Sequence, residues 1–305
     1  MRKHLKVFNS LDDLDNYYDE AKGYFVGYKK QNQSEVRYEK LYTSNADKTV
    51  VIRNSINNKD MIVRESDYYK RYIFDNRYKK CDYLTFTGNG TIKILPIYPS
   101  VAETYFYRRN FYYSRDGISW TQYVLGNTLS VSKGQKLMMR GDFDYLGYNG
   151  PNDIWRHNFV MTGTIYASGC VNSLLSGYPN RIYSPSYAFP SLFQGCTSLI
   201  TAPDLPATNI YDYCYSNMFF GCTNLKQAPI LPALLVYSGS YESMFYGCSN
   251  LSYVKALFIN MTNNSATQNW LNGVSESGTF VKNKNAEWNI TGANGVPEGW
   301  TIEYE

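Results

Sequence analysis

The stretch Met218-Phe-Phe-Gly-Cys-Thr-Asn-Leu225 decides the fold, because it recurs at a fixed distance on either side. Leu192-Phe-Gln-Gly-Cys-Thr-Ser-Leu199 precedes it by 26 residues, and Met244-Phe-Tyr-Gly-Cys-Ser-Asn-Leu251 follows it by 26 residues. A repeat of constant period predicts a solenoid, in which each coil buries its apolar side chains against the neighbouring coils. The positions that define the repeat are Cys170, Cys196, Cys222 and Cys248, together with Phe193, Phe219, Phe245, Leu199, Leu225 and Leu251.

The four repeat cysteines stand 26 residues apart, so stacked coils would bring their thiols to about 5 Å, the spacing of neighbouring strands. That distance permits disulfides, but small buried thiols that fill a narrow corner of the coil are the favoured interpretation. The chain has no Cys-x-x-Cys motif and only two histidines, His4 and His157. We therefore expect no metal site, no cofactor and no catalytic residue.

Within each repeat, aromatic residues recur at four-residue steps ahead of the Gly-Cys pair. This spacing places them on one face of a short helix, and the glycine before each cysteine stands where a helix end favours positive φ. The following segment, as in Ala202-Pro-Asp-Leu-Pro-Ala207, is rich in proline and predicts a short extended rung at a sheet edge. Each coil is thus predicted to be a helix, a glycine turn and a short strand. The residues concerned are Tyr211, Tyr215 and Phe219, then Tyr237, Tyr241 and Phe245, with Gly195, Gly221 and Gly247.

The chain divides into four predicted regions, which together make an α+β or mainly β fold. Residues 1–80 carry 17 basic and 12 acidic residues and form a small N-terminal attachment domain. Residues 81–168 contain short β runs between turn signals and form a β-sandwich. Residues 169–262 form the short β/α solenoid with its 26-residue period, and residues 263–305 form a C-terminal β cap with Trp270, Trp288 and Trp300.

Composition and charge exclude several classes of protein. The 305-residue chain is 44% hydrophobic, yet it has no apolar run of the roughly 18 residues that a membrane span needs. Asp12, Asp13 and Asp15 stand where a cleaved export signal would need apolar residues, so we expect no export by that route. Basic residues alternate with acidic ones instead of clustering, which argues against a nucleic-acid partner.

The repeat resembles the BspA-like leucine-rich repeats of Bacteroidetes surface proteins, whose pattern reads roughly Y-x-x-M-F-x-G-C-T-x-L-x-x-A-P-x-L-P-A. The resemblance covers about residues 82–305 and includes Pro297-Glu-Gly-Trp300 in the tail. The position of Cys170 is usually Asn in that family. The resemblance implies a leucine-rich-repeat fold in one of two settings: adhesin-like proteins of the bacterial surface, or virion fibres of Bacteroidetes phages, including crAss-like phages.

The predicted function is that of a non-enzymatic phage virion structural protein, a head or tail fibre or decoration component made in the host cytoplasm. Residues 1–80 would attach to other virion proteins, and the solenoid would face a host surface glycan or protein. A homo-oligomer is expected, as fibres are usually symmetric. The alternative is an adhesin-like binding protein on the bacterial cell surface. A glycan-degrading fibre enzyme is the third hypothesis, with Asp116, Asp142, Asp144 and Asp153 as candidate acids.

For binding, the sequence offers only a strip of outward positions on successive rungs, a surface that solenoids often use. A solvated face without a ligand explains the same positions equally well. The 31 tyrosines of the chain favour a role in contact, since Tyr supplies stiff amphipathic area; burial within the rungs is the competing explanation. The strip consists of Thr201, Asp204, Gln227, Ile230, Tyr253 and Lys255.

Overall fold

The structure is a computed structural model of the chain, and it divides into two compact units, Met1–Lys80 and Cys81–Glu305. The described residues are five strands of the first unit and, in the second, residues 82–97, 110–149, 154–176 and 183–305. In these ranges no helix is both long enough and apolar enough to pass through a membrane. Cys81 and Asp153 lie outside the described residues.

The described strands of the first unit form two small antiparallel sheets. One consists of β3 (Tyr38–Ser44), β4 (Thr49–Asn54) and β5 (Asp60–Arg64) in that order. The other pairs β1 (Lys30–Gln31) with β2 (Ser34–Glu35). The attachment role was predicted for all of residues 1–80, and much of this segment lies outside the described residues.

The second unit begins with a sheet built on two long strands. β6 (Leu84–Ile97) and β12 (Ile154–Ser168) pair antiparallel from Arg156 opposite Ile97 to Ser168 opposite Thr85. Shorter strands extend the sheet to the order β11-β12-β6-β10-β7-β8, with β9 also paired to β6. These strands are β7 (Phe111–Ser114), β8 (Thr121–Tyr123), β9 (Leu129–Val131), β10 (Leu137–Gly141) and β11 (Gly147–Asn149).

Hydrogen bonds join the seven described strands of this region, for which a β-sandwich was predicted, and β14 (Leu199–Thr201) of the solenoid into one eight-stranded sheet. One face carries the core, including Leu84, Phe86 and Phe159, which have no exposed surface. Beneath it, the 3₁₀ turn η2 (Val171–Leu174) places Ser173, whose hydroxyl donates to Met139 O and accepts from Leu84 N. The segment that follows β12 in the chain is therefore hydrogen-bonded to strands β6 and β10 of the sheet.

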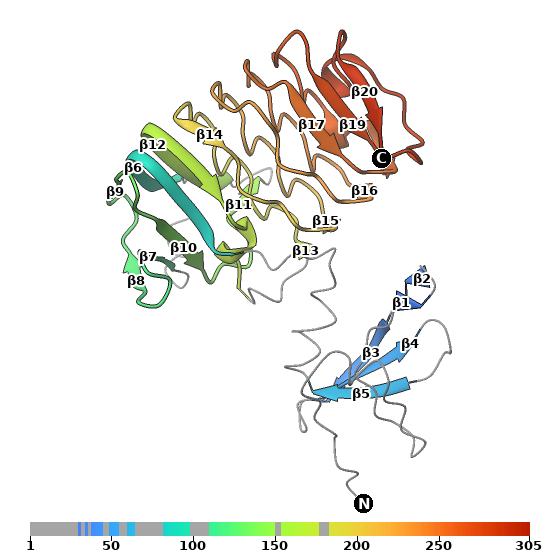
Figure 1. The fold of residues 1–305 in the computed structure, drawn as a ribbon, viewed down its shortest axis with the longest axis horizontal. Helices are drawn as coiled ribbons and strands as arrows, with labels where there is room; N and C mark the ends of the chain where they lie inside the picture. Colours follow the sequence, from blue (N-terminus) through green and yellow to red (C-terminus); the bar gives the residue numbers. More distant parts are fainter. Residues whose placement is uncertain are drawn as a thin grey trace, which may run out of the picture. The chain divides into compact units, whose positions relative to one another are not determined.

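The chain then winds into a β-solenoid of about five turns, seen as the stacked coils between β14 and β20 in Figure 1. Its strands are short and pair in parallel, as stacked coils require: β12 with β14, β13 with β15, β16 with β18, β17 with β19, and β19 with β20. The first coil pairs with β12, so the sheet and the solenoid form one continuous body. The strands are β13 (Tyr183–Ser184), β14 (Leu199–Thr201), β15 (Asn209–Ile210), β16 (Leu235–Val236), β17 (Tyr253–Ala256), β18 (Asn260–Met261), β19 (Thr279–Lys282) and β20 (Thr301–Tyr304).

The helix predicted in each repeat is wrong: besides their short strands, the described coils contain turns and the short 3₁₀ segments η3 (Asn264–Thr267) and η4 (Gly292–Asn294), and no α-helix. Some backbone N–H groups of a coil donate to the next coil, and others donate within their own coil. Phe193 N donates to Met218 O of the next coil at 2.8 Å, whereas Cys196 N donates back to Phe193 O at 3.0 Å. Positive φ recurs every fourth residue, as at Tyr213, Asn217 and Gly221. A succession of four-residue turns therefore gives the same inward spacing as a helix, but bonds each coil to its neighbour.

Aromatic rings stack in columns inside the solenoid. Phe193, Phe219 and Phe245 follow one another with centroids 5.4 and 5.5 Å apart and planes within 3° of parallel. Below them, Phe159 of β12 extends the column at 5.1 Å. A second column runs through Phe189, Tyr215, Tyr241 and Trp270. Leu199, Leu225 and Leu251 are also fully buried, so the repeat positions form the core as predicted.

The C-terminal segment adds coils of its own instead of only covering the last one. Its backbone continues the repeat, since Phe245 N donates to Trp270 O and Gly247 N donates to Asn272 O. All three tail tryptophans are buried, and each indole N–H donates to a backbone carbonyl more than twenty residues away in sequence: Trp270 to Gly295 O, Trp288 to Phe258 O and Trp300 to Ser275 O. These bonds tie successive coils together.

Candidate functional site

The six residues of the predicted binding strip lie on neighbouring rungs, and some of them are direct neighbours. Gln227 and Tyr253 are neighbours in a parallel bridge, and Leu231 N, next to Ile230 in the chain, donates to Lys255 O at 3.0 Å. The first rung sits on the sheet: Thr201 pairs with Tyr166, and Asp204 pairs with Cys170. The six residues thus lie on three consecutive rungs.

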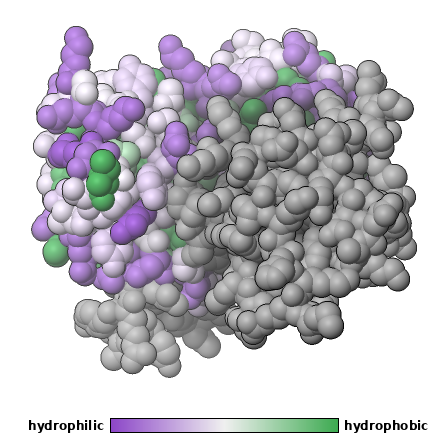
Figure 2. All heavy atoms as spheres, turned by 60° about the horizontal axis from the view of Figure 1, so that its bottom comes forward, coloured by the Kyte–Doolittle hydropathy of each residue, from purple (hydrophilic) through white to green (hydrophobic). Residues whose placement is uncertain are grey.

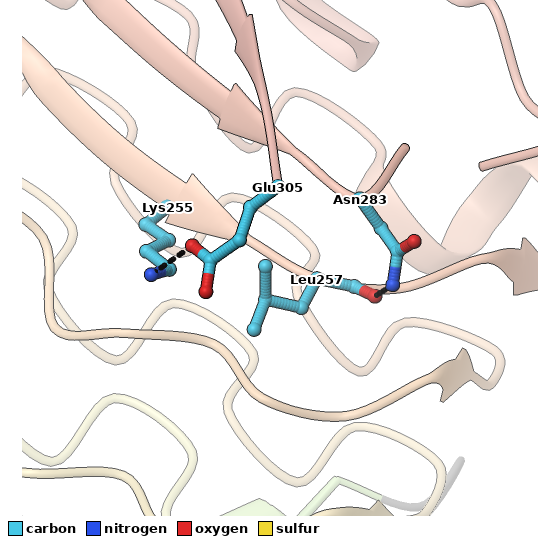
Figure 3. A network of polar contacts seen from close by, with 4 residues as sticks. All are labelled: Lys255, Leu257, Asn283 and Glu305. Carbon is cyan, nitrogen blue, oxygen red and sulfur yellow. Dashed lines mark hydrogen bonds and ion pairs between the residues drawn. The ribbon is translucent and has the colours of Figure 1, made fainter. Parts of the chain in front are cut away.

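The exposure of the strip is uneven. Thr201, Asp204, Gln227 and Ile230 are exposed, with Ile230 at 52%. The Thr201 hydroxyl donates to Ala167 O at 2.8 Å, and the Lys255 side chain, only 20% exposed, forms an ion pair with Glu305. Figure 3 shows this ion pair beside the Asn283 side chain, which donates to Leu257 O at 3.0 Å. Part of the strip is therefore occupied by contacts between coils.

Several tyrosine rings of the solenoid are stacked on one another in pairs. Tyr211 stacks on Tyr237 with centroids 5.7 Å apart, and Tyr187 stacks on Tyr213 at 5.3 Å. The ring of Tyr213 in turn lies against Gly239, where an added Cβ would come within 2.2 Å of it. Stacking covers one face of each of these rings, so that face is closed to a ligand. On the face drawn in Figure 2, coloured residues are mostly hydrophilic or neutral, with isolated hydrophobic spots.

The repeat thiols are structural. The thiols of Cys196, Cys222 and Cys248 donate to Phe159 O, Phe193 O and Phe219 O at 3.0 to 3.1 Å, and all three cysteines are buried and free. Burial raises the pKa of the Cys196 and Cys248 thiols to about 12, so both stay protonated and unreactive at neutral pH.

Cys170 is buried as well, but it lies in another register, beside Asp204. The 26-residue spacing predicts Cys170 in the position next to Cys196 in the column. Strand β12 occupies that position instead, and its Phe159 O accepts a hydrogen bond from the Cys196 thiol. The column of thiols therefore starts at Cys196.

The candidate acids within the described ranges accept hydrogen bonds from the protein itself. Asp116 Oδ1 accepts from the backbone N–H groups of Ile118 and Ser119 and from the Ser114 hydroxyl, all at 2.8 Å. These hydrogen bonds hold the Asp116 pKa well below its usual range. Asp142 Oδ1 accepts from Asn110 N at 2.5 Å, and Asp144 Oδ1 accepts from the Ser176 hydroxyl at 2.9 Å.

A cluster that the sequence analysis did not single out lies on the outer face of the sheet. Arg140 of β10 stands opposite Tyr112 of β7, which stands opposite Gln122 of β8, so their side chains point to one face. Arg140 Cζ lies over the ring of Tyr112 at 5.3 Å and over that of Trp120 at 4.6 Å. Alternation in Asn110-Phe-Tyr112, Trp120-Thr-Gln122 and Arg140-Gly-Asp142 is the only local signal for it, and the pairing of three separate strands is not visible in such a pattern.

No family model, curated protein or solved structure matches the chain.

Proposed function

We propose that the chain is a non-enzymatic structural protein of a phage virion, a head or tail fibre or decoration component that presents its solenoid to a host surface or another protein. One observation carries the proposal: the core of the solenoid consists of stacked columns that run from the sheet through successive coils, as in Phe159, Phe193, Phe219 and Phe245. Such a stack is a rigid spacer whose outer surface is free for contact. The resemblance of the repeat to BspA-like repeats is compatible with this setting and with the bacterial surface alike.

The roles of the candidate acids support a non-enzymatic protein. A general acid or base acts through a carboxyl group whose pKa lies near the working pH. The pKa of Asp116 is lowered instead, because three donors hold its carboxylate inside a tight turn. Asp142 and Asp144 are likewise hydrogen-bonded within the sheet region.

In this proposal residues 1–80 attach the chain to other virion proteins, and the assembled protein is a homo-oligomer of the mature particle. Peptide mass spectrometry of density-purified phage particles, with immunogold labelling by an antibody against residues 183–305, tests it. We expect peptides of this chain at a copy number set by the particle's symmetry, with gold on the head or tail. Absence from washed particles refutes it, and gold on uninfected bacterial cells would favour the adhesin-like alternative.

A further inference from the structure

The outer face of the sheet around Arg140 has the composition of a binding site for an acidic sugar. Its guanidinium is half-buried against the rings of Tyr112 and Trp120, and Tyr83 supports Trp120 edge-on with centroids 4.6 Å apart. Rings on which an arginine rests fix the direction of its planar fork. Arg140 is thereby held in position before any ligand arrives.

Within the described ranges, no hydrogen-bond acceptor and no ion-pair partner contacts the Arg140 guanidinium. Arginine elsewhere on the same unit behaves differently, since Arg115 Nη2 donates to Ser130 O at 2.8 Å. A guanidinium carries five N–H donors in a geometry that matches a carboxylate bidentately. An immobilised, unpaired fork of this kind fits an anionic group that comes from outside the chain.

Two amide side chains lie on the same face of the sheet, Gln122 on β8 beyond Tyr112 and Asn110 just before β7. Gln122 Nε2 donates to Asn110 Oδ1 at 2.8 Å, which leaves the Gln122 carbonyl and the Asn110 amide N–H₂ outside that bond. A donor and an acceptor side by side match the hydroxyl pairs of a sugar ring. Asp142, two residues beyond Arg140, accepts from Asn110 N and brings negative charge to this end. The ligand carboxylate therefore lies toward Trp120, and its hydroxyls lie toward Asn110.

We propose that Arg140, Tyr112, Trp120, Gln122 and Asn110 bind a carboxylate-bearing sugar of an acidic glycan, such as a hexuronic acid. Arg140 takes the carboxylate, and the two amides take ring hydroxyls. This site lies on the sheet and not on the solenoid strip. It holds for a virion protein and for a cell-surface protein alike, so its failure would leave the virion proposal standing.

Calorimetry of the full chain tests the site with two probes, oligogalacturonate and its methyl ester, which differ only in the free carboxylate. We expect the acid to bind and the ester to bind at least about tenfold more weakly, as loss of a charge-assisted pair predicts. Arg140→Gln and Arg140→Lys should both lower the affinity for oligogalacturonate about tenfold or more. Lysine is included because it keeps the charge but lacks the planar fork of donors. Arg115→Gln, the same charge change at a residue outside the site, should stay within about twofold of the parent.

Gln122→Ala changes an exposed side chain and provides a second variant should Arg140→Gln fail to fold. It should lower the affinity for oligogalacturonate several-fold. A short polyglutamate peptide serves as the non-sugar anion and should bind far more weakly than oligogalacturonate. The proposal is overturned if neither the acid nor the ester binds at millimolar concentration, if acid and ester bind equally, or if Arg115→Gln loses as much as Arg140→Gln. Equal binding of polyglutamate would reject a sugar in favour of an acidic peptide.

Discussion

His157 shows how burial at one residue sets a pH dependence for the whole sheet. Its ring is 1% exposed and lies between Phe111 and Phe143, with centroids 5.2 and 5.1 Å away. Burial disfavours the imidazolium form and lowers the pKa of His157 to about 4 from its ordinary 6.5. The unfolded chain therefore binds a proton between these values that the folded chain does not.

Because unfolding takes up this proton, stability should fall as the pH drops through 6.5 toward 4. Between pH 7.5 and pH 5 we expect a loss of about 2 kcal/mol from His157, measured by urea unfolding followed by tryptophan fluorescence. His157→Leu should lack this part of the slope, while all other contributions to it are common to both proteins. Parallel losses in the parent and the variant over this range would show that His157 is not the cause.

At the scale of the element, a coil is held to its neighbours by ring columns and by alternate backbone N–H groups. Phe219 is fully buried and touches Phe193 and Phe245, so Phe219→Ala should cost roughly 3–5 kcal/mol of unfolding free energy. Tyr211→Ala is the matched control, since Tyr211 also stacks on the next coil but is 45% exposed. Its cost should stay near 1 kcal/mol. Chemical denaturation of both variants measures the difference, and similar costs would refute a core organised by the inner column.

The repeat period, the buried thiols and the positive φ of Gly195, Gly221 and Gly247 are readable from the sequence, because three nearly identical stretches report the same local geometry. The helix is a false expectation with a physical origin. A four-residue spacing of inward rings arises from a helix and equally from four-residue turns. The deciding fact is positive φ at residues such as Tyr213 and Ser243, which side-chain propensity does not announce.

The sites divide in the same way. Positions on successive rungs, such as Gln227 and Tyr253, follow from the period alone, and the structure places these two side by side. Arg140, Tyr112 and Gln122 come together only through the pairing of three strands whose register depends on the whole sheet. Register of this kind is decided by non-local packing. Contacts within a repeat are therefore readable from the sequence, and contacts between distant strands are not.

At the scale of the whole molecule, stability should grow coil by coil, as in other stacked repeats. Deleting residues 219–244 joins Met218 to Phe245 and removes one 26-residue period, so every column closes in register. Deleting residues 219–231 removes half a period and places outward residues in the core. The deletion of residues 219–244 should give a protein with the parent's β-type circular dichroism and a lower unfolding midpoint, because one interface between coils is lost.

The deletion of residues 219–231 should abolish cooperative unfolding, since a shifted register buries polar groups without partners. Size-exclusion chromatography and urea unfolding of the two variants measure this, and equal tolerance of both deletions would mean that stacking in register does not hold the solenoid together.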